Sequence, residues 1–552
     1  HKNMHLQKSV QLLGCIAISS LAACAALLCT PLSACGSGGG NSVDLDPNKE
    51  TILISVYGGG FGSNWAVDML NEYNKTLTGK YQFGKIQDNT DDIATINQKL
   101  NSGISQADIY FTDDCALTDL VRGNKLLDLS PVWNATPDAS SPQRALSEKF
   151  VFAEQLSQIA SDGQGARYAM PYTMGVSGIV YDRDLFVSSG WLISDTSTAN
   201  GLSEGADKTE GTYDDGLPAT LAEWETLLQK IKSANMMPYV LMGTIGGAGT
   251  EHVMESVWAQ YEGMESYMTS FDYEGKMYFP STGTTETITP QTGYKVYSSS
   301  EGRDKGIDVI AEYILRDGFV LEKSKDLSHT EAEQEFLFSH NTGNVRVAMT
   351  AQGCWWENEA RPAFDSDAKR NGARWGYGKR NFGLMPIPQI ENQHESSNGK
   401  SFYAVNTYGT VFAVKSADTE KNQAILDFLT YFASNKGLNS FTKSVGTMPG
   451  YRFEIEDDVY EGLTYFGKDY YQVLNSSSVE VVAPTLFKYA SRINYAPMNP
   501  PARDDVKSGT RTYTSAYQAF KNGISFDSVK STLKSTWNET NWSALYREVF
   551  GS

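Results

Sequence analysis

The sequence predicts an α/β fold with a mostly parallel sheet, divided into two or more lobes. Short β-branched runs alternate with stretches of helical periodicity through the first part of the chain, which is the pattern of strands joined by helical crossovers. The chain has 552 residues, of which 40% are hydrophobic. This length and content allow a large core and favour more than one lobe.

The first elements follow from local patterns near the start of the proposed fold. Residues 51–57 form a β-branched run that ends in the glycine turn 58–62, which predicts a buried strand. Residues 63–76 carry apolar side chains at helical spacing, as expected for a helix lying on a sheet. A second pair follows, with a helix expected at 91–100 and a strand at 108–111.

The middle of the chain combines ordered elements with insertions. Residues 168–186 read as a strand, a glycine-punctuated stretch and another strand, and we expect a crossover between lobes there. An amphipathic helix is predicted at 221–233, with Thr220 as its N-cap. Residues 194–218 and 271–300 are rich in polar and turn-forming residues, so we expect surface insertions at both places.

The second half repeats the alternation. The run 344–350 predicts a strand that ends in a glycine and tryptophan loop. Loops at the carboxyl ends of such strands are where α/β sheets bind ligands. A second crossover is expected to begin at 381–388 and to return through the strand 409–414. A helix is expected at 420–433 and a third crossing near 445–450.

The N-terminal segment predicts export. Lys2 and Lys8 precede the uncharged, apolar run 10–32, which is the layout of a secretory signal. We expect the signal to occupy residues 1–34 and to be removed, with the glycine-rich segment 35–50 as a flexible tether. An uncleaved N-terminal anchor helix is the alternative, and it would change the attachment but not the location outside the cell.

A lipidation site is predicted at the end of this signal. The residues Leu32-Ser33-Ala34-Cys35 resemble the lipobox of bacterial lipoproteins, in which the cysteine is acylated and becomes the new N-terminus. A second match ends at Cys24, but the sequence after Cys24 is still apolar and would make a poor tether. We therefore expect Cys35 to hold the protein at the extracellular face of the cell membrane.

Charge and cysteine content restrict the partners. The net charge is −19, and removing residues 1–34 takes away two lysines and no acid, which leaves −21. Such a charge argues against nucleic acid and anionic lipid as partners. Beyond the signal and Cys35, only Cys115 and Cys354 remain. These two are neither a disulfide framework nor a metal-binding motif, and we expect free thiols.

Several segments, taken in order, resemble the solute-binding proteins of carbohydrate ABC importers, the group that includes maltose-binding protein. They are the Asp-Ile-Tyr-Phe strand at 108–111, the stretch 170–186, the Leu-Pro-Ala-Thr at 217–220 before a tryptophan-containing helix, the segment 349–356, and the Met-Pro-Ile-Pro at 385–388. The resemblance implies a two-lobed, type II periplasmic-binding-protein fold with the ligand held in a cleft between lobes.

The same resemblance implies the function and the organisation. We expect a monomeric, lipid-anchored subunit that captures an oligosaccharide for membrane-embedded ABC permease subunits, without catalysis and without a required cofactor. The N-terminal lobe is expected at 51–172 with 401–445, and the C-terminal lobe at 173–400 with 446–552. The insertions at 194–218 and 271–300 have no counterpart in the resemblance, so the outer wall of the cleft and the ligand length stay open.

The expected ligand-binding residues are aromatic platforms and polar side chains that can pair with hydroxyls in the plane of a sugar ring. They are Tyr57, Phe61, Asp113, Asp114, Tyr172, Trp355, Trp356 and Tyr408. Because neighbours on an extended segment point in opposite directions, at most one of the two tryptophans is expected to face ligand. The alternatives are core packing for the aromatic residues and a turn or N-cap role for the aspartates.

Residues 207–216 carry several carboxylates around glycine turns, a composition typical of calcium loops. Asp207, Asp214 and Asp215 are the candidate ligands of a structural Ca²⁺. The segment lacks the alternating ligands and closing glutamate of an EF-hand, so a solvated acidic loop is the alternative.

Two other functional classes stay open. Paired carboxylates beside aromatic residues also describe a glycoside hydrolase, although the sequence contains no zinc-protease, nucleophile-elbow, phosphate-loop or Cys-x-x-Cys motif. A glycan-binding surface adhesin without an importer would also be lipidated and rich in aromatic residues.

Overall fold

The computed structural model describes residues 42–140, 142–486, 489 and 516–550. The predicted signal, Cys35 and the start of the tether therefore lie outside the described residues. Ser42–Ser552 form one compact unit. Within its described part, no helix is both long enough and apolar enough to cross a membrane.

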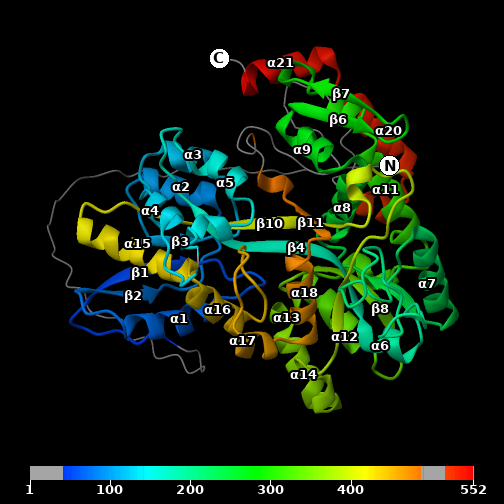
Figure 1. Ribbon diagram of the computed structural model, residues 1–552, viewed down its shortest axis with the longest axis horizontal. Helices are drawn as coiled ribbons and strands as arrows, with labels where there is room; N and C mark the ends of the chain where they lie inside the picture. The colour runs from blue at the N-terminus through cyan, green and yellow to red at the C-terminus, as the bar shows by residue number, and fades with distance from the viewer. Residues whose placement is uncertain (1–41, 141, 487–488, 490–515, 551–552) are drawn as a thin grey trace, which may run out of the picture. The chain divides into compact units, whose positions relative to one another are not determined.

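A mixed sheet of nine strands organises the described fold, which confirms the predicted α/β class (Figure 1). Its strand order is β2-β1-β3-β10-β4-β8-β5, with β11 beside β10 and β9 beside β4. The strands are β1 (Glu50–Val56), β2 (Tyr81–Lys85), β3 (Ile109–Phe111), β4 (Met170–Asp182), β5 (Met237–Val240), β8 (Val347–Gly353), β9 (Phe382–Met385), β10 (Ser401–Ala413) and β11 (Val479–Val482).

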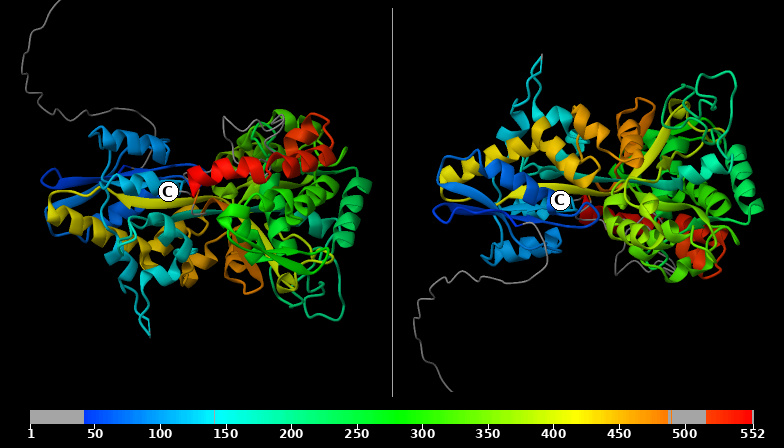
Figure 2. Two further views of the ribbon diagram at one scale, coloured as in Figure 1. Left: turned by 90° about the horizontal axis from the view of Figure 1, so that it is seen from above. Right: turned by 90° about the horizontal axis from the view of Figure 1, so that it is seen from below.

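Helices cover both faces of this sheet (Figure 2). The longer ones are α1 (Asn64–Asn74), α2 (Ile93–Asn101), α5 (Ala153–Ala160), α7 (Leu221–Ser233), α8 (Thr250–Glu262), α9 (Met264–Asp272), α11 (Gly302–Tyr313), α12 (His329–Phe338), α14 (Arg361–Asn371), α15 (Thr419–Ala433), α16 (Asn435–Val445), α18 (Tyr465–Asn475), α20 (Phe526–Thr536) and α21 (Glu539–Val549). The shorter ones are α3 (Thr118–Arg122), α4 (Ser130–Asn134), α6 (Arg183–Ser188), α10 (Lys295–Ser298), α13 (Trp356–Glu359), α17 (Asp457–Glu461) and α19 (Ala516–Lys521).

Local sequence signals place several of these helices correctly. α7 begins after Thr220, whose hydroxyl accepts a hydrogen bond from the Glu223 N–H, and the Glu223 side chain completes a capping box. In α15 the buried face consists of Ile425, Phe428, Leu429, Phe432 and Ala433, which reproduces the helical spacing read from the sequence.

Two long antiparallel strands, β4 and β10, connect the two ends of the sheet (Figure 1). The two strands predicted within 168–186 are one continuous, fully buried strand. Its glycines do not break it, because they allow close packing: a Cβ on Gly175 would lie 2.2 Å from Asn406 Oδ1. The second crossover also differs from the prediction, since 381–388 contributes β9, an edge partner of β4, and the long strand is β10.

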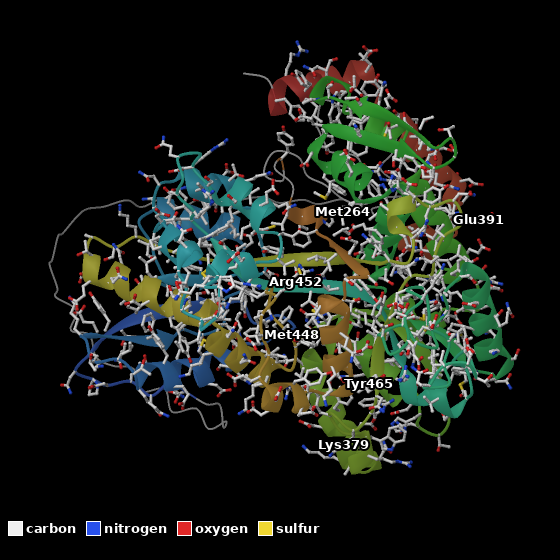
Figure 3. All side chains as sticks on the ribbon, in the orientation of Figure 1. Met264, Lys379, Glu391, Met448, Arg452 and Tyr465 are labelled. Carbon is white, nitrogen blue, oxygen red and sulfur yellow. The ribbon has the colours of Figure 1, made fainter. Side chains whose placement is uncertain are left out.

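A loop after α16 runs beside β4 at the position of the predicted third crossing. The Gly450 N–H donates a hydrogen bond to the Tyr172 carbonyl oxygen over 3.0 Å. Met448 in the same loop is buried in the largest core, and Figure 3 labels it near the middle of the view.

Three clusters of buried apolar side chains form the core of the described residues. The largest contains residues from β1, β3, β4, β10, α1 and α15, and it continues to Trp356 and Phe466. The second lies around α7, α8 and α11. Because the largest cluster includes residues of both expected lobes, the lobe boundaries given above stay a prediction.

The insertion expected at 271–300 is more ordered than its polar composition suggested. It forms the hairpin of β6 (Gly275–Phe279) and β7 (Thr284–Ile288), followed by α10. Its apolar residues, with Trp537 and Trp542 of the C-terminal region, build the third core cluster. Aromatic residues spread among Thr and Gly therefore carry the packing of a segment that looked like a surface loop.

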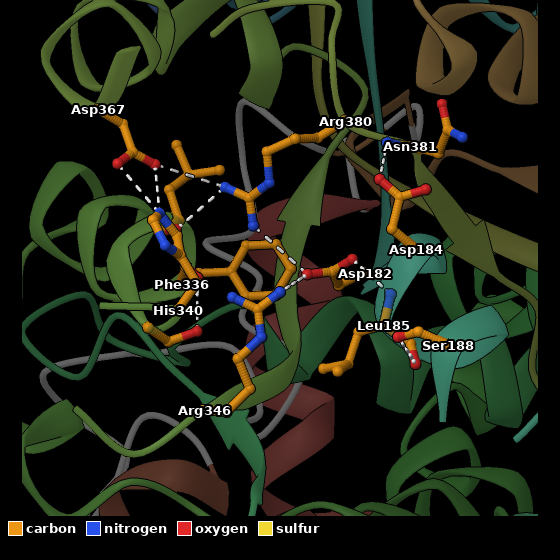
Figure 4. A network of polar contacts seen from close by, with 12 residues as sticks. Asp182, Asp184, Leu185, Ser188, Phe336, His340, Arg346, Asp367, Arg380 and Asn381 are labelled. Atoms are coloured by element: carbon orange, nitrogen blue, oxygen red, sulfur yellow. Dashed lines mark hydrogen bonds and ion pairs between the residues drawn. The ribbon is translucent and has the colours of Figure 1, made fainter. Parts of the chain in front are cut away.

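A buried ionic network fixes the far end of β4 (Figure 4). Asp182 pairs with Arg346 and, at 3.4 Å, with Arg380. Arg380 also approaches Asp367 at 3.8 Å, and His340 Nε2 lies 2.8 Å from the same carboxylate. The network joins β4, α14 and the segments that flank α12 and β9.

Candidate ligand-binding site

A cavity of about 500 Å³ opens where several strands end, within the size range of ligand pockets. β1 and β3 run parallel, as do β5 and β8, and β10 and β4 lie between the two pairs. The loops after β1, β3, β5 and β8 all contribute to the cavity wall. This is the place where open α/β sheets bind ligands, because the carboxyl ends of parallel strands leave a crevice there.

The first wall comes from the loops after β1 and β3. Tyr57, Phe61 and Asp113 line the cavity, and the Tyr57 N–H donates to the Phe111 carbonyl oxygen over 2.9 Å. Asn358 Nδ2 donates to the Gly60 carbonyl oxygen over 2.8 Å. That hydrogen bond joins the β1 loop to the segment that follows β8.

Trp355 is held in this wall by close contacts with glycines. A Cβ on Gly60 would lie 1.9 Å from its indole Cδ1, and a Cβ on Gly353 would lie 2.0 Å from Cζ3. Both contacts are possible only because glycine has no side chain. Phe61 lies beside the indole with a centroid separation of 6.0 Å. The indole therefore has a fixed position as a flat apolar surface on the cavity.

The opposite wall is formed by the loop after β5 and the first turn of α8. Met242 and Ile245 supply apolar surface, and Glu251 and His252 supply polar groups. Ile245 is 43% exposed. The wall thus combines an aliphatic surface with an ionisable pair.

The crossing strands contribute polar groups of their own. Thr173 and Ser177 of β4 line the cavity together with Asn406 and Thr407 of β10. The register between β4 and β10 shifts between Val405 and Tyr408, and bulges of this kind redirect side chains near functional sites. The cavity is therefore built partly from the strands that connect the two ends of the sheet.

Asp113 and Tyr57 interact electrostatically on the first wall. Burial raises the pKa of Asp113, and the neighbouring Asp114 adds to this effect. The Asp113 carboxylate in turn raises the pKa of Tyr57, with smaller contributions from burial and from Glu359. Tyr57 thus keeps its proton and can donate a hydrogen bond.

His252 lies between two carboxylates on the opposite wall. Its Nε2 is 3.4 Å from Glu251 Oε1, and its Nδ1 is 3.9 Å from Glu255 Oε2. Burial alone would lower the pKa of His252, but Glu251 and Glu255 outweigh it and raise the pKa. Burial raises the pKa of Glu255.

A second histidine–carboxylate pair lies at the start of α12. His329 Nε2 is 3.8 Å from Glu359 Oε2, and both residues line the cavity. Glu333, on the same face of α12, is almost completely buried. Burial, followed by the charge of Glu359, raises the pKa of Glu333 far above its usual range, so Glu333 is protonated at neutral pH.

Gln352 of β8 presents an unsatisfied donor. The residue is 3% exposed and lines the cavity, and its Nε2 has no hydrogen-bond partner within the described residues. Buried amide donors without a partner are rare because their desolvation is costly. A ligand oxygen would satisfy this group.

Five of the eight predicted ligand-binding residues line the cavity, and three lie elsewhere. Tyr57, Phe61, Asp113, Tyr172 and Trp355 belong to its wall, although their contact with a ligand stays a prediction.

The other three predicted residues are not part of the cavity lining. Trp356 is completely buried against Phe364, Phe382 and Phe466. The side chains of Trp355 and Trp356 point in different directions because a helix begins there: Trp355 has helical backbone angles and is the N-cap of α13. The extended segment expected from the sequence is not the cause. Tyr408 is 1% exposed and its hydroxyl donates to the Val151 carbonyl oxygen.

Asp114 stabilises a turn, which was the alternative to ligand binding for this residue. Its Oδ1 accepts hydrogen bonds from the backbone N–H groups of Cys115 (2.7 Å) and Ala116 (3.1 Å). The carboxylate thereby organises the turn after β3, and its neighbour Asp113 is the residue on the cavity wall.

Sequence reasoning missed most of the polar wall: Thr173, Ser177, Glu251, His252, His329, Gln352, Glu359, Asn406 and Thr407. One signal was available. The strand β5 is followed by a loop with four glycines at 243, 246, 247 and 249 and then by a helix, which is a strand, glycine turn and helix like that after β1. The bulge in β10 gave no local signal.

The acidic segment 207–216 uses its carboxylates for its own turns. Asp214 accepts from the Asp207 N–H (3.0 Å) and from the Thr212 hydroxyl (2.8 Å), while Asp215 accepts from the Gly211 N–H (2.7 Å). In the described part of the chain, no group of three or more His, Cys, Asp or Glu side chains is arranged to hold a metal ion. The geometry gives no support to the calcium hypothesis, which stays untested.

Cys115 and Cys354 are buried and are not joined to each other. Burial is the first cause that raises the pKa of each thiol, to about 12. Both side chains therefore remain protonated and unreactive at neutral pH.

The fold is of the type II, two-lobed class. Residues 58–288 match the family described as "Bacterial extracellular solute-binding protein". No curated protein matches the chain by sequence.

Solved structures give the same fold. A probable secreted solute-binding lipoprotein from Streptomyces coelicolor is 14% identical, with 89% of this chain and 99% of that chain covered and a TM-score of 0.53. RafE in complex with raffinose is 12% identical, with coverage of 90% and 100% and a TM-score of 0.51. A chitin oligosaccharide binding protein is 13% identical, with coverage of 90% and 99% and a TM-score of 0.52.

Proposed function

We propose that the protein captures a carbohydrate, in particular an oligosaccharide, and delivers it to the permease of an ABC importer. The observation that carries the proposal is the cavity itself. It combines a fixed indole, Trp355, with hydroxyl, amide and carboxylate groups around it. A sugar has apolar C–H faces edged by hydroxyls, so it needs both kinds of surface at once.

The position of the cavity supports capture by closure. Its walls come from the two ends of the sheet, and its polar groups Asn406 and Thr407 lie on a connecting strand. A ligand that contacts both walls would stabilise the arrangement in which they are close, as in hinge closure. The carbohydrate ligands named for two of the similar structures, raffinose and chitin oligosaccharide, agree with this substrate class.

Attachment to the membrane belongs to the same proposal. Acylation of Cys35 would hold the protein at the outer face of the cell membrane, where its ligand-loaded form meets the permease. Mass spectrometry of the protein purified from membranes would detect a diacylglycerol-modified N-terminal cysteine; an unmodified, uncleaved N-terminus would refute this part of the proposal.

Calorimetric titration with malto-, xylo-, manno- and galacto-oligosaccharides tests the substrate class. At least one series should bind with a saturable isotherm, and small-angle scattering should give a smaller radius of gyration in its presence. Binding without compaction would instead favour a rigid glycan-binding adhesin. Shortened sugars in the same incubation would favour a glycoside hydrolase, and no binding by any series would refute the proposal.

A further inference from the structure

The cavity has an unbalanced set of charges. Asp113, Glu251 and Glu359 line it, and none of its lining residues is Lys or Arg. The two histidines on the wall, His252 and His329, each lie within 4 Å of one of these carboxylates. Three carboxylates from three separate segments therefore line one space of about 500 Å³: the loop after β3, the first turn of α8 and the end of α13.

Two further carboxyl groups lie directly behind the wall. Glu255 is 2% exposed and stands behind His252, and Glu333 is 1% exposed and stands behind Glu359. Glu251 Oε2, Glu255 Oε2 and Glu333 Oε1 have no hydrogen-bond partner among the described residues. In the described part of the chain, no Lys or Arg pairs with these five carboxylates, and His252 and His329 are the basic side chains beside them. Histidine carries a positive charge only when it is protonated, so the set as a whole stays acidic.

The charge imbalance discriminates between ligands by their charge. Like charges in a partly enclosed space raise one another's energy, and an added anion would raise it further. A neutral sugar leaves the repulsion in place, although its hydroxyls can donate hydrogen bonds. A ligand ammonium both donates hydrogen bonds and reduces the repulsion, and such charge-assisted bonds are about twice as strong as neutral ones.

Other groups on the wall fit a carbohydrate that bears this charge. The buried Gln352 Nε2 offers a donor to a ring or hydroxyl oxygen, and the Trp355 indole offers a stacking surface that also attracts cations. The walls therefore provide for the uncharged part of such a sugar as well as for its charged group.

We propose that the ligand of this cavity is an amino sugar, a carbohydrate that carries a protonated amine, and that Glu251 and Glu359 select it over neutral and acidic sugars. This inference rests on the proposed carbohydrate-binding function. It makes the two glutamates specificity-determining residues, one on each wall.

Matched sugars test the inference in the full-length protein. Glucosamine, galactosamine and β-1,4-linked glucosamine oligomers are titrated calorimetrically beside glucose, galactose, cello-oligosaccharides and galacturonate, at low and at high salt. In the pair of amino and neutral sugar that binds best, the amino sugar should bind at least about tenfold more tightly than the neutral one. This difference in affinity should decrease at high salt, and galacturonate should not bind.

Glu251→Gln and Glu359→Gln separate charge from hydrogen bonding, because the amide keeps the shape and loses the charge. Each should weaken amino-sugar binding about tenfold and leave binding of the neutral partner within about twofold. Asp317→Asn is the control, since Asp317 is exposed and is not among the residues that line the cavity. Two variants on different helices protect the test against a folding defect in one of them.

Three outcomes would overturn the inference. Equal or tighter binding of the neutral partner, or equal weakening of both sugars by each glutamine variant, would refute amino-sugar selection and leave the proposed function intact. Absence of binding by every sugar, here and in the oligosaccharide panel above, would refute the proposed function together with the inference.

Discussion

The indole N–H of Trp65 donates a hydrogen bond to the Tyr172 hydroxyl over 2.8 Å, and both side chains are buried. Tyr172 belongs to β4 and Trp65 to α1, so this hydrogen bond links α1 to one of the two long strands of the sheet. Tyr172 also packs against Phe111 and Phe441. Tyr172 therefore lies on the cavity wall while its hydroxyl is committed to the Trp65 N–H.

Tyr172→Phe should reduce stability more than affinity. The change leaves the Trp65 N–H buried without an acceptor, which costs about 1–3 kcal/mol. Chemical denaturation should show this loss in the free energy of unfolding, and calorimetry should give a Kd within about twofold of the wild-type value. Tyr57→Phe is the matched control, because Tyr57 is on the exposed side of the wall and should show the opposite pattern. A large loss of affinity in Tyr172→Phe would mean that its hydroxyl contacts ligand.

The adjacent tryptophans should respond oppositely to truncation. Trp355→Ala removes the surface exposed to the cavity and should weaken the best ligand at least about tenfold, with little effect on thermal stability. Trp356→Ala removes a completely buried side chain and should cost about 3–5 kcal/mol of unfolding free energy. Paired calorimetry and denaturation measurements on both variants check this prediction.

Unchanged affinity in Trp355→Ala would place the sugar-stacking surface elsewhere in the cavity. If both variants unfolded to the same extent, the difference in burial between the two side chains would be refuted. Phe61→Ala offers a third comparison, because Phe61 contacts the Trp355 indole and lines the same wall.

Local patterns predicted the elements better than the site. The N-cap at Thr220 and the apolar spacing of α15 depend on neighbouring residues, so the sequence contains them. The strand β4 was divided in two because Gly175 and Gly178 look like turn signals. Tertiary packing against Asn406 requires the small size of Gly175, and Leu384 lies close to Gly178.

The cavity depends on relationships that no short segment contains. Trp355 could be chosen because a strand precedes its loop, but its separation from Trp356 depends on where α13 begins. Glu251 of α8 and Glu359 of α13 line the same cavity although they are over 100 positions apart in the sequence. Asn406 and Thr407 reach it through a shift in strand register, which follows from the pairing of β10 with β4 and not from their own sequence.

Arg380→Met should strongly destabilise the protein. Arg380 is buried and approaches both Asp182 and Asp367, and its Nη1 donates to the Leu337 carbonyl oxygen over 3.0 Å. Its removal leaves two buried carboxylates less well compensated, at a cost of about 3–5 kcal/mol. Urea denaturation measures the change.

Lys468→Met is the matched control for this ionic network. Lys468 forms a more exposed pair with Glu461 at 2.9 Å, and exposed pairs contribute at most about 1 kcal/mol. A loss in Arg380→Met no larger than that in the control would mean that the network of Figure 4 does not stabilise the fold.

Asp469→Asn should make stability less dependent on pH. Asp469 is buried in α18 and accepts a hydrogen bond from the Leu384 N–H over 2.8 Å, and burial raises its pKa to about 7. Its usual pKa is about 3.9, so the folded state binds more protons than the unfolded state between these values. The associated stability is complete below the unfolded pKa and is lost as the pH rises through about 7.

The variant removes this proton linkage, because asparagine keeps an acceptor for Leu384 and does not ionise. The wild-type Tm should decrease between pH 5 and pH 8, and this decrease should be smaller in Asp469→Asn. Part of the decrease should remain in the variant, because burial also raises the pKa of Glu357 to about 7. Differential scanning calorimetry across this range measures the slope, with the exposed Asp317→Asn as control. If Asp469→Asn kept the full wild-type slope, Asp469 would be ionised in the folded protein throughout the range.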